Sequence, residues 1–168
     1  VDLHHSLFSS VFGASPNPIM FADLQGTAIF ANPAFVSTFG FTGEGLNCFE
    51  SPFVPEDDMD HTRNDVASLL KGSQIPERET IRHTSAGETR EVTVSLSLCR
   101  GSGADPTGVL IIIRDITEEK KKDRELIQAE KMSVVGQLSS KLAHEINNPV
   151  QVIMGHTDLL LLDENLDG

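Results

Sequence analysis

A histidine and a glutamate are adjacent in residues 141–149, which read KLAHEINNP. The neutral imidazole of His144 is a good nucleophile near neutral pH, because the unperturbed pKa of histidine is about 6.5. The carboxylate of Glu145 can accept a hydrogen bond from one ring nitrogen, which fixes the tautomer and leaves the other nitrogen free to attack. Phosphoryl transfer depends on in-line positioning more than on covalent assistance, so this pair is suited to accepting a phosphoryl group.

The histidine falls on the polar side of a helical pattern. Apolar residues recur in steps of three, four and seven, the period of a helix with one buried face: Val135, Leu138, Leu142, Ile146, Val150, Ile153 and Leu160. His144 lies opposite this stripe, so we expect it to be exposed and accessible to a second domain. Pro149 cannot donate a hydrogen bond to the carbonyl of Glu145, and it is expected to kink the helix just after the histidine.

The segment resembles the H-box of sensor histidine kinases, whose dimerisation and phosphotransfer domain begins with a helix carrying His-Glu-x-x-Asn-Pro. The resemblance implies that His144 is the phosphoacceptor and Glu145 its acid/base partner. It also implies that Asn148 helps to orient water when the partner response regulator is dephosphorylated, and that Pro149 is the kink proline. The phosphoryl donor would be ATP with Mg²⁺, held by a catalytic domain that this chain does not include.

The adjacent histidine and glutamate have two other interpretations. Such pairs are common on exposed helices as inert charge. A zinc-protease helix would need a second histidine three residues after the glutamate, but position 148 is Asn. We therefore expect no metal site here.

Composition limits the classes of partner. The chain has 168 residues, a formal net charge of −12 and a pI near 4.8, which argues against binding nucleic acid or an anionic membrane surface. The two cysteines, Cys48 and Cys99, form no disulfide framework and no metal-binding spacing, which favours a reducing compartment. No signal peptide or membrane-spanning run is visible, so a cytoplasmic location is expected, and a parent protein can still be anchored further upstream.

The first part of the chain alternates short elements. Residues 1–14 are predicted to form an amphipathic helix, and residues 15–18, Ser-Pro-Asn-Pro, should end it. Strands are expected at 19–22 and 27–30, joined by a turn at 23–26. Asn32 then caps a short helix that has a proline in its first turn.

A helix over 60–71 and three longer strands follow, at 77–84, 89–100 and 108–115. Two strands, several short helices and three strands make an α+β unit. Residues 15–117 resemble the PAS sensory domain, a five-stranded antiparallel sheet with short flanking helices. The closing Asp115-Ile116-Thr117-Glu118 resembles the exit motif of that family. Asp115 and Glu118 are also predicted to form a capping box for the next helix.

The last part is predicted to be one long helix. Residues 118–131 are dense in charge with few apolar positions, which fits a coiled-coil linker, although a lone solvated helix is the alternative. Residues 132–168 read as the truncated first helix of the dimerisation and phosphotransfer domain. A helix with a long apolar face is not stable alone, so we expect a homodimer.

Two residues are candidates for holding a cofactor in the sensory domain. Residues 45–48 read GLNC, the Gly-x-Asn-Cys motif of flavin-binding photoreceptor domains, but the continuation that holds the flavin phosphate is missing. A buried structural Cys48 is the alternative. His61 lies one residue out of phase with the iron ligand of haem-binding relatives, and an exposed helical histidine is its alternative. The ligand is otherwise an undetermined small molecule, or there is none.

The sequence thus predicts the sensory and phosphoacceptor portion of a histidine kinase. The full-length parent would phosphorylate itself on His144 and pass the phosphoryl group to an aspartate of a response regulator receiver domain. This chain alone should be inactive as an enzyme. The alternative is a non-catalytic PAS module that dimerises or binds a ligand.

Overall fold

The computed structural model describes residues 10–43, 45–101 and 105–164. The chain divides into two compact units, residues 1–120 and residues 121–168. Of the amphipathic helix predicted over 1–14, residues 10–14 are helical, and the remainder lies outside the described residues.

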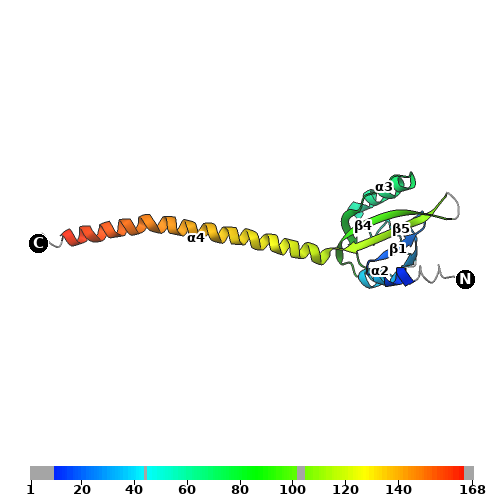
Figure 1. Cartoon of the computed structure of the whole chain (residues 1–168), viewed down its shortest axis with the longest axis horizontal. Coiled ribbons are helices and arrows are strands. Elements are labelled where there is room, and N and C mark those ends of the chain that lie inside the picture. The colour runs from blue at the N-terminus through cyan, green and yellow to red at the C-terminus, as the bar shows by residue number, and fades with distance from the viewer. Residues whose placement is uncertain (1–9, 44, 102–104, 165–168) are drawn as a thin grey trace. The chain divides into compact units, whose positions relative to one another are not determined.

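The first unit is built on a five-stranded antiparallel sheet (Figure 1). Its strands are β1 (Ile19–Ala22), β2 (Ala28–Ala31), β3 (Arg78–His83), β4 (Thr89–Arg100) and β5 (Pro106–Asp115). The spatial order is β2-β1-β5-β4-β3, so the first and last strands pair at the centre, with Ile19 opposite Ile112. The predicted five-stranded antiparallel sheet is confirmed.

Short helices flank the sheet. The helix α2 (Pro33–Phe39) contacts β1, and α3 (Met59–Leu70) contacts β4; a 3₁₀ turn, η1 (Glu56–Asp58), leads directly into α3. Three phenylalanines, Phe35, Phe39 and Phe53, are fully buried and stack with ring centroids 5.2–5.6 Å apart. Such tilted and edge-on pairs add to the free energy of apolar burial.

Asn32 joins α2 to the start of β1. Its side chain is fully buried, and its Oδ1 accepts hydrogen bonds from the backbone N–H of Phe35 and of Ile19, both at 2.9 Å. Its Nδ2 donates to the carbonyl oxygens of Asn17 at 2.9 Å and Phe12 at 3.2 Å. The predicted cap is confirmed, and the same side chain also ties down the chain segment that precedes the sheet.

Replacing Asn32 by aspartate is expected to lower the free energy of unfolding by about 2–4 kcal/mol. The aspartate keeps the oxygen that caps α2, but it sets a second oxygen against two carbonyl oxygens. Urea unfolding of the variant and of Asn17→Asp, a matched change at an exposed asparagine, measures the effect. Equal losses in the two variants would contradict the argument.

The second unit is helical. The helix α4 begins at Thr117 and continues through Pro149 to Glu164. Its start differs from the predicted capping box, since Asp115 accepts from the backbone N–H of Thr117 at 2.9 Å, and the Thr117 hydroxyl accepts from the N–H of Glu91 at 3.0 Å. No helix among the described residues is long and apolar enough to cross a membrane.

Candidate functional site

The histidine predicted to carry the chemistry lies on α4. His144 is exposed, as are Glu145, Asn148 and Pro149. Within the part of the chain that the structure describes, the side chains of His144 and Glu145 make no hydrogen bond or ion pair. Successive residues on a helix point in directions roughly 100° apart, which separates the imidazole from the neighbouring carboxylate. The bond expected between the two is therefore not made in this structure.

The residues that share the face of His144 follow from helical geometry. Asn148 lies four positions later, one turn along, so its amide is on the side of the helix that carries the imidazole. Leu142 lies two positions before His144, about 200° round the helix. Pro149 does not end the helix, but it removes the N–H that would bond the carbonyl of Glu145.

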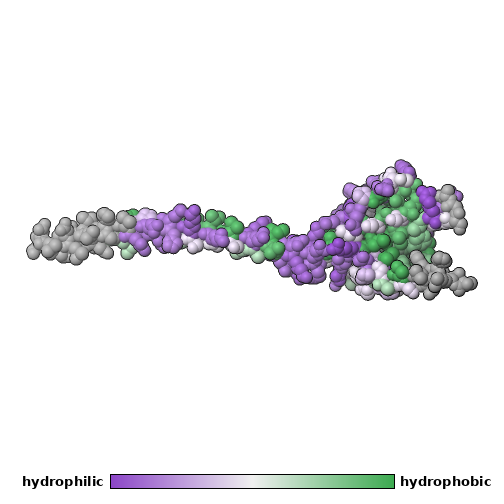
Figure 2. Space-filling view, in the orientation of Figure 1, coloured by the Kyte–Doolittle hydropathy of each residue, from purple (hydrophilic) through white to green (hydrophobic). Residues whose placement is uncertain are grey.

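An apolar stripe runs along the side of α4 that lies opposite His144. Its side chains are exposed in the single chain, for example Leu138 at 56%, Leu142 at 56% and Ile146 at 60%. Figure 2 shows these apolar patches interrupting the hydrophilic surface of the helix. The described members of the predicted stripe are Val135, Leu138, Leu142, Ile146, Val150 and Ile153. Large apolar side chains repeated at this spacing need a covering partner in water.

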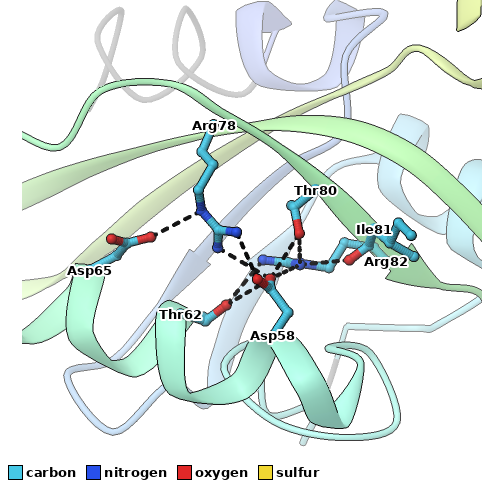
Figure 3. A network of polar contacts seen from close by, with 7 residues as sticks. All are labelled: Asp58, Thr62, Asp65, Arg78, Thr80, Ile81 and Arg82. Atoms are coloured by element: carbon cyan, nitrogen blue, oxygen red, sulfur yellow. Dashed lines mark hydrogen bonds and ion pairs between the residues drawn. The ribbon is translucent and has the colours of Figure 1, made fainter.

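The first unit, residues 1–120, is called the sensory unit below. It contains a second polar constellation, between β3 and the start of α3 (Figure 3). Asp58 accepts two hydrogen bonds from Arg78, at 2.6 and 3.1 Å, and one from Arg82 at 2.8 Å. The hydroxyls of Thr80 and Thr62 also donate to Asp58, at 2.8 and 3.3 Å. Asp58 thus contacts both guanidinium groups, and Asp65 makes a second ion pair with Arg78, at 3.3 Å from its Nε.

Arg82 is the deeply buried member of this network, with 3% of its surface exposed. Its Nη1 donates to Asp58 and to the carbonyl of Ile81, and its Nη2 donates to the Thr62 hydroxyl at 3.3 Å. The guanidinium also lies 5.9 Å from the ring centroid of Phe53. Burial lowers the pKa of Arg82, and the hydrogen bond to Asp58 opposes this shift. The buried, charged guanidinium therefore depends on Asp58 as its counter-ion.

The pKa of Asp58 is held well below its usual range. Burial alone would raise it, but the hydrogen bonds from Arg78, Arg82 and Thr80 outweigh burial and stabilise the charged form. The sequence interpretation missed this network. The signal was the period-two run of Arg78, Thr80 and Arg82, which places three polar side chains on one face of a strand, toward α3.

Cys48 lies in the core, as the structural alternative for it expected. Its side chain is 3% exposed, and its Sγ is 3.8 Å from the Sδ of Met20. Burial, with a smaller contribution from Asp23, raises the pKa of the thiol to about 12. The thiol is therefore protonated and unreactive at neutral pH. His61 is exposed on α3. The flavin and haem hypotheses stay predictions.

Cys48 lines a cavity whose lining also includes Arg78 and Arg82. The centre of a water molecule can occupy about 20 Å³ of it, which is room for about one water. The predicted cofactor candidates are not brought together here, because Cys48 borders the cavity and His61 does not. Among the described residues, no cluster of histidine, cysteine and acidic side chains is arranged to hold a metal ion.

Comparison with known proteins gives a family for this fold. The family described as PAS fold matches residues 12–121. The PAS domain of a protein from Colwellia psychrerythraea superposes with a TM-score of 0.61 at 20% identity, over 68% of this chain and 98% of that one. At that identity the superposition shows the fold alone.

Two curated relatives are histidine kinases by name. Sensor histidine kinase TmoS of Ectopseudomonas mendocina is 28% identical over 156 residues, covering 88% of this chain and 16% of that protein. Sensory histidine kinase/phosphatase NtrB of Rhizobium meliloti (strain 1021) is 31% identical over 172 residues, covering 93% of this chain and 40% of that protein. The chain therefore spans less than half the length of these relatives.

Proposed function

This chain belongs to the PAS fold family, and we propose that it is the sensory and phosphoacceptor part of a sensor histidine kinase. His144 would receive a phosphoryl group from ATP and pass it to an aspartate on a response regulator. The kinase activity belongs to the parent protein, because ATP and Mg²⁺ would be held by a domain beyond this chain. Location in the cytoplasm, where ATP is available, is part of the same proposal.

The exposed imidazole on α4 carries this proposal. The free ring nitrogen of neutral His144 attacks the γ-phosphorus, a P–N bond forms, and the bond to the bridging oxygen breaks as ADP leaves. Glu145 would accept the ring proton once the catalytic domain has docked and turned the imidazole toward it. Asn148, on the histidine's face, would orient the water that hydrolyses the aspartyl phosphate of the regulator.

A second copy of this chain would cover the apolar stripe opposite the histidine. The stripe needs an apolar partner, and the same stripe from a second α4 matches it in length and spacing. In such a homodimer His144 stays on the outside, where the catalytic domain and the regulator can approach in turn.

A second candidate function is a non-catalytic PAS module that dimerises or binds a ligand. It is favoured by one observation: the family match ends at residue 121, before the histidine, and residues 1–120 form a compact unit by themselves. In that case the His144–Glu145 pair would be inert surface charge.

Peptide mapping of the phosphorylated parent protein distinguishes the two candidates. After incubation with radiolabelled ATP and Mg²⁺, the label is expected in the peptide that contains His144. It should be lost in acid and kept in base, as a phosphoramidate requires. Label on serine or threonine, or no label at all, would remove the kinase assignment and favour the PAS module. Label on another histidine would remove the assignment of His144 as the phosphoacceptor.

A further inference from the structure

A cleft between α3 and the inner face of the sheet has one charged end and one apolar end. Thr62, Asp65, Arg78 and Arg82 form the charged end. Apolar side chains form the rest of the lining, among them Phe49, Ile75, Val94 and Leu96. Because the cleft has room for about one water molecule, it suits the anionic head of a ligand whose hydrocarbon tail lies outside it.

An open groove on the surface adjoins this cleft. The groove has a volume of about 360 Å³, and Leu69, Ile75, Leu96 and Leu98 provide its apolar lining. Ile75 and Leu96 line both spaces. Ile75 is half-buried in residues 71–77, which have no helix or strand and whose neighbours Gly72 to Gln74 are exposed. Ile75 is therefore the side chain that a ligand reaching from the cleft into the groove would displace.

Arg78 offers a replaceable position at the charged end. Its two terminal nitrogens hold Asp58, at 2.6 and 3.1 Å, whereas its Nε contacts Asp65 at 3.3 Å (Figure 3). The side chain of Asp65 is 29% exposed, so it can turn to water at little cost. A second carboxylate can then occupy the Nε of Arg78 while Asp58 keeps both arginines compensated.

We infer that this cleft binds an aliphatic monocarboxylate. Its carboxylate replaces Asp65 at Arg78 and accepts a hydrogen bond from Nη2 of Arg82, which has the Thr62 hydroxyl as its acceptor here. Its chain passes the position of Ile75 and lies in the groove along Leu69 and Leu98. The inference deepens the sensory role proposed above by giving the class of ligand. Binding is measured directly, so its failure is distinguishable from a failure of phosphotransfer.

Isothermal titration of the full chain with sodium octanoate tests the inference. Calorimetry suits this chain because it contains no Trp and no Tyr to report binding by fluorescence. Octanoate is expected to bind, and 1-octanol and octanamide to bind at least about ten-fold more weakly, because a charge-assisted hydrogen bond is worth about 1.5–3 kcal/mol. Equal binding of the acid and the alcohol would overturn the inference, and so would no binding of octanoate.

Two variants with opposite expected effects locate the head group. Arg78→Met should weaken octanoate binding by at least about ten-fold. Asp65→Asn should tighten it by up to about five-fold, because it weakens the competing ion pair. Arg63→Met removes an equal charge from an arginine that pairs with Glu50 outside the cleft, and it should bind like the wild type. Unchanged affinity in both Arg78→Met and Asp65→Asn would overturn the inference.

Discussion

Replacing His144 by glutamine in the parent kinase is expected to abolish incorporation of phosphate from ATP. Glutamine has a similar size and keeps a polar, exposed group on α4, but its amide nitrogen is not nucleophilic. No neighbouring side chain can substitute, because the described residues around His144 offer no other imidazole on that face. A radiolabelled-ATP assay measures the loss, which should exceed about 100-fold for a nucleophile.

The matched control for this experiment is His61→Gln. His61 is also an exposed histidine on a helix, but it lies in the sensory unit. This control should incorporate phosphate at the wild-type rate. If His144→Gln kept more than about a tenth of the wild-type label, His144 would not be the phosphoacceptor. If both variants lost the label, the effect would be on folding or on dimer formation.

Asp58→Ala is expected to destabilise the sensory unit by about 3–5 kcal/mol, because it leaves the buried Arg82 without its counter-charge. Asp60→Ala is the matched control, since the Asp60 side chain is 91% exposed and 3.9 Å from Arg63. Urea unfolding measured by circular dichroism gives both values. A loss below about 1 kcal/mol in Asp58→Ala would mean that water compensates the guanidinium groups.

The same comparison has a pH dependence of known sign. The pKa of Asp58 in the folded chain lies below the unfolded value of about 3.9. The contribution of Asp58 to the free energy of unfolding is therefore complete above about pH 4. The contribution falls as the pH drops from about 4 through the folded pKa. The stability difference between wild type and Asp58→Ala should therefore shrink in acid. A difference that stayed constant from pH 6 to pH 2.5 would contradict the assignment of the lowered pKa.

Much of the fold could be predicted from the sequence, because its elements are marked by local signals. The strand at 89–100 alternates strictly, and its observed bounds are the predicted ones. Asn32 and Pro33 together mark the start of α2, as found. The helix predicted over 60–71 begins one residue earlier, at Met59, and Asp58 is the residue that precedes its first turn. Local sequence patterns suffice where a single residue determines where a helix or strand begins.

Local sequence patterns could not predict the polar network around Asp58. Asp58 and Arg82 are brought together by the packing of α3 on the sheet, so no spacing along the chain marks them as partners. Charged residues also read as exposed by default, since they are rarely buried without a partner. The capping box at Asp115 failed for a related reason. Thr117 bonds Glu91 on a neighbouring strand, a tertiary contact that the local pattern does not contain.

The histidine segment could be placed on a helix from sequence, and it lies on α4. Every described side chain around it is exposed in the single chain, so the exposure expected for His144 stays a prediction. Its chemistry stays a prediction, because reactivity depends on groups that approach from outside this chain. Periodicity alone separated His144 from the apolar stripe. The hydrogen bond expected from the His144 ring to the Glu145 carboxylate is not made here, because the side chains of adjacent helical residues diverge.

The pairing of β1 with β5 at the centre of the sheet determines when the sensory unit can fold during its synthesis. Ile19 reaches its partner Ile112 only when nearly the whole sensory unit has been translated. Such long-range pairing makes a sheet slow to form, and in a nascent chain lacking β5 one edge of β1 is unpaired and accessible to chaperones and to other chains. Once Asp115 has left the ribosome the sheet can close, while the apolar stripe of α4 has still to emerge. Residues 1–120 can therefore begin to fold before that stripe is accessible to other growing chains, which lessens misassembly between them.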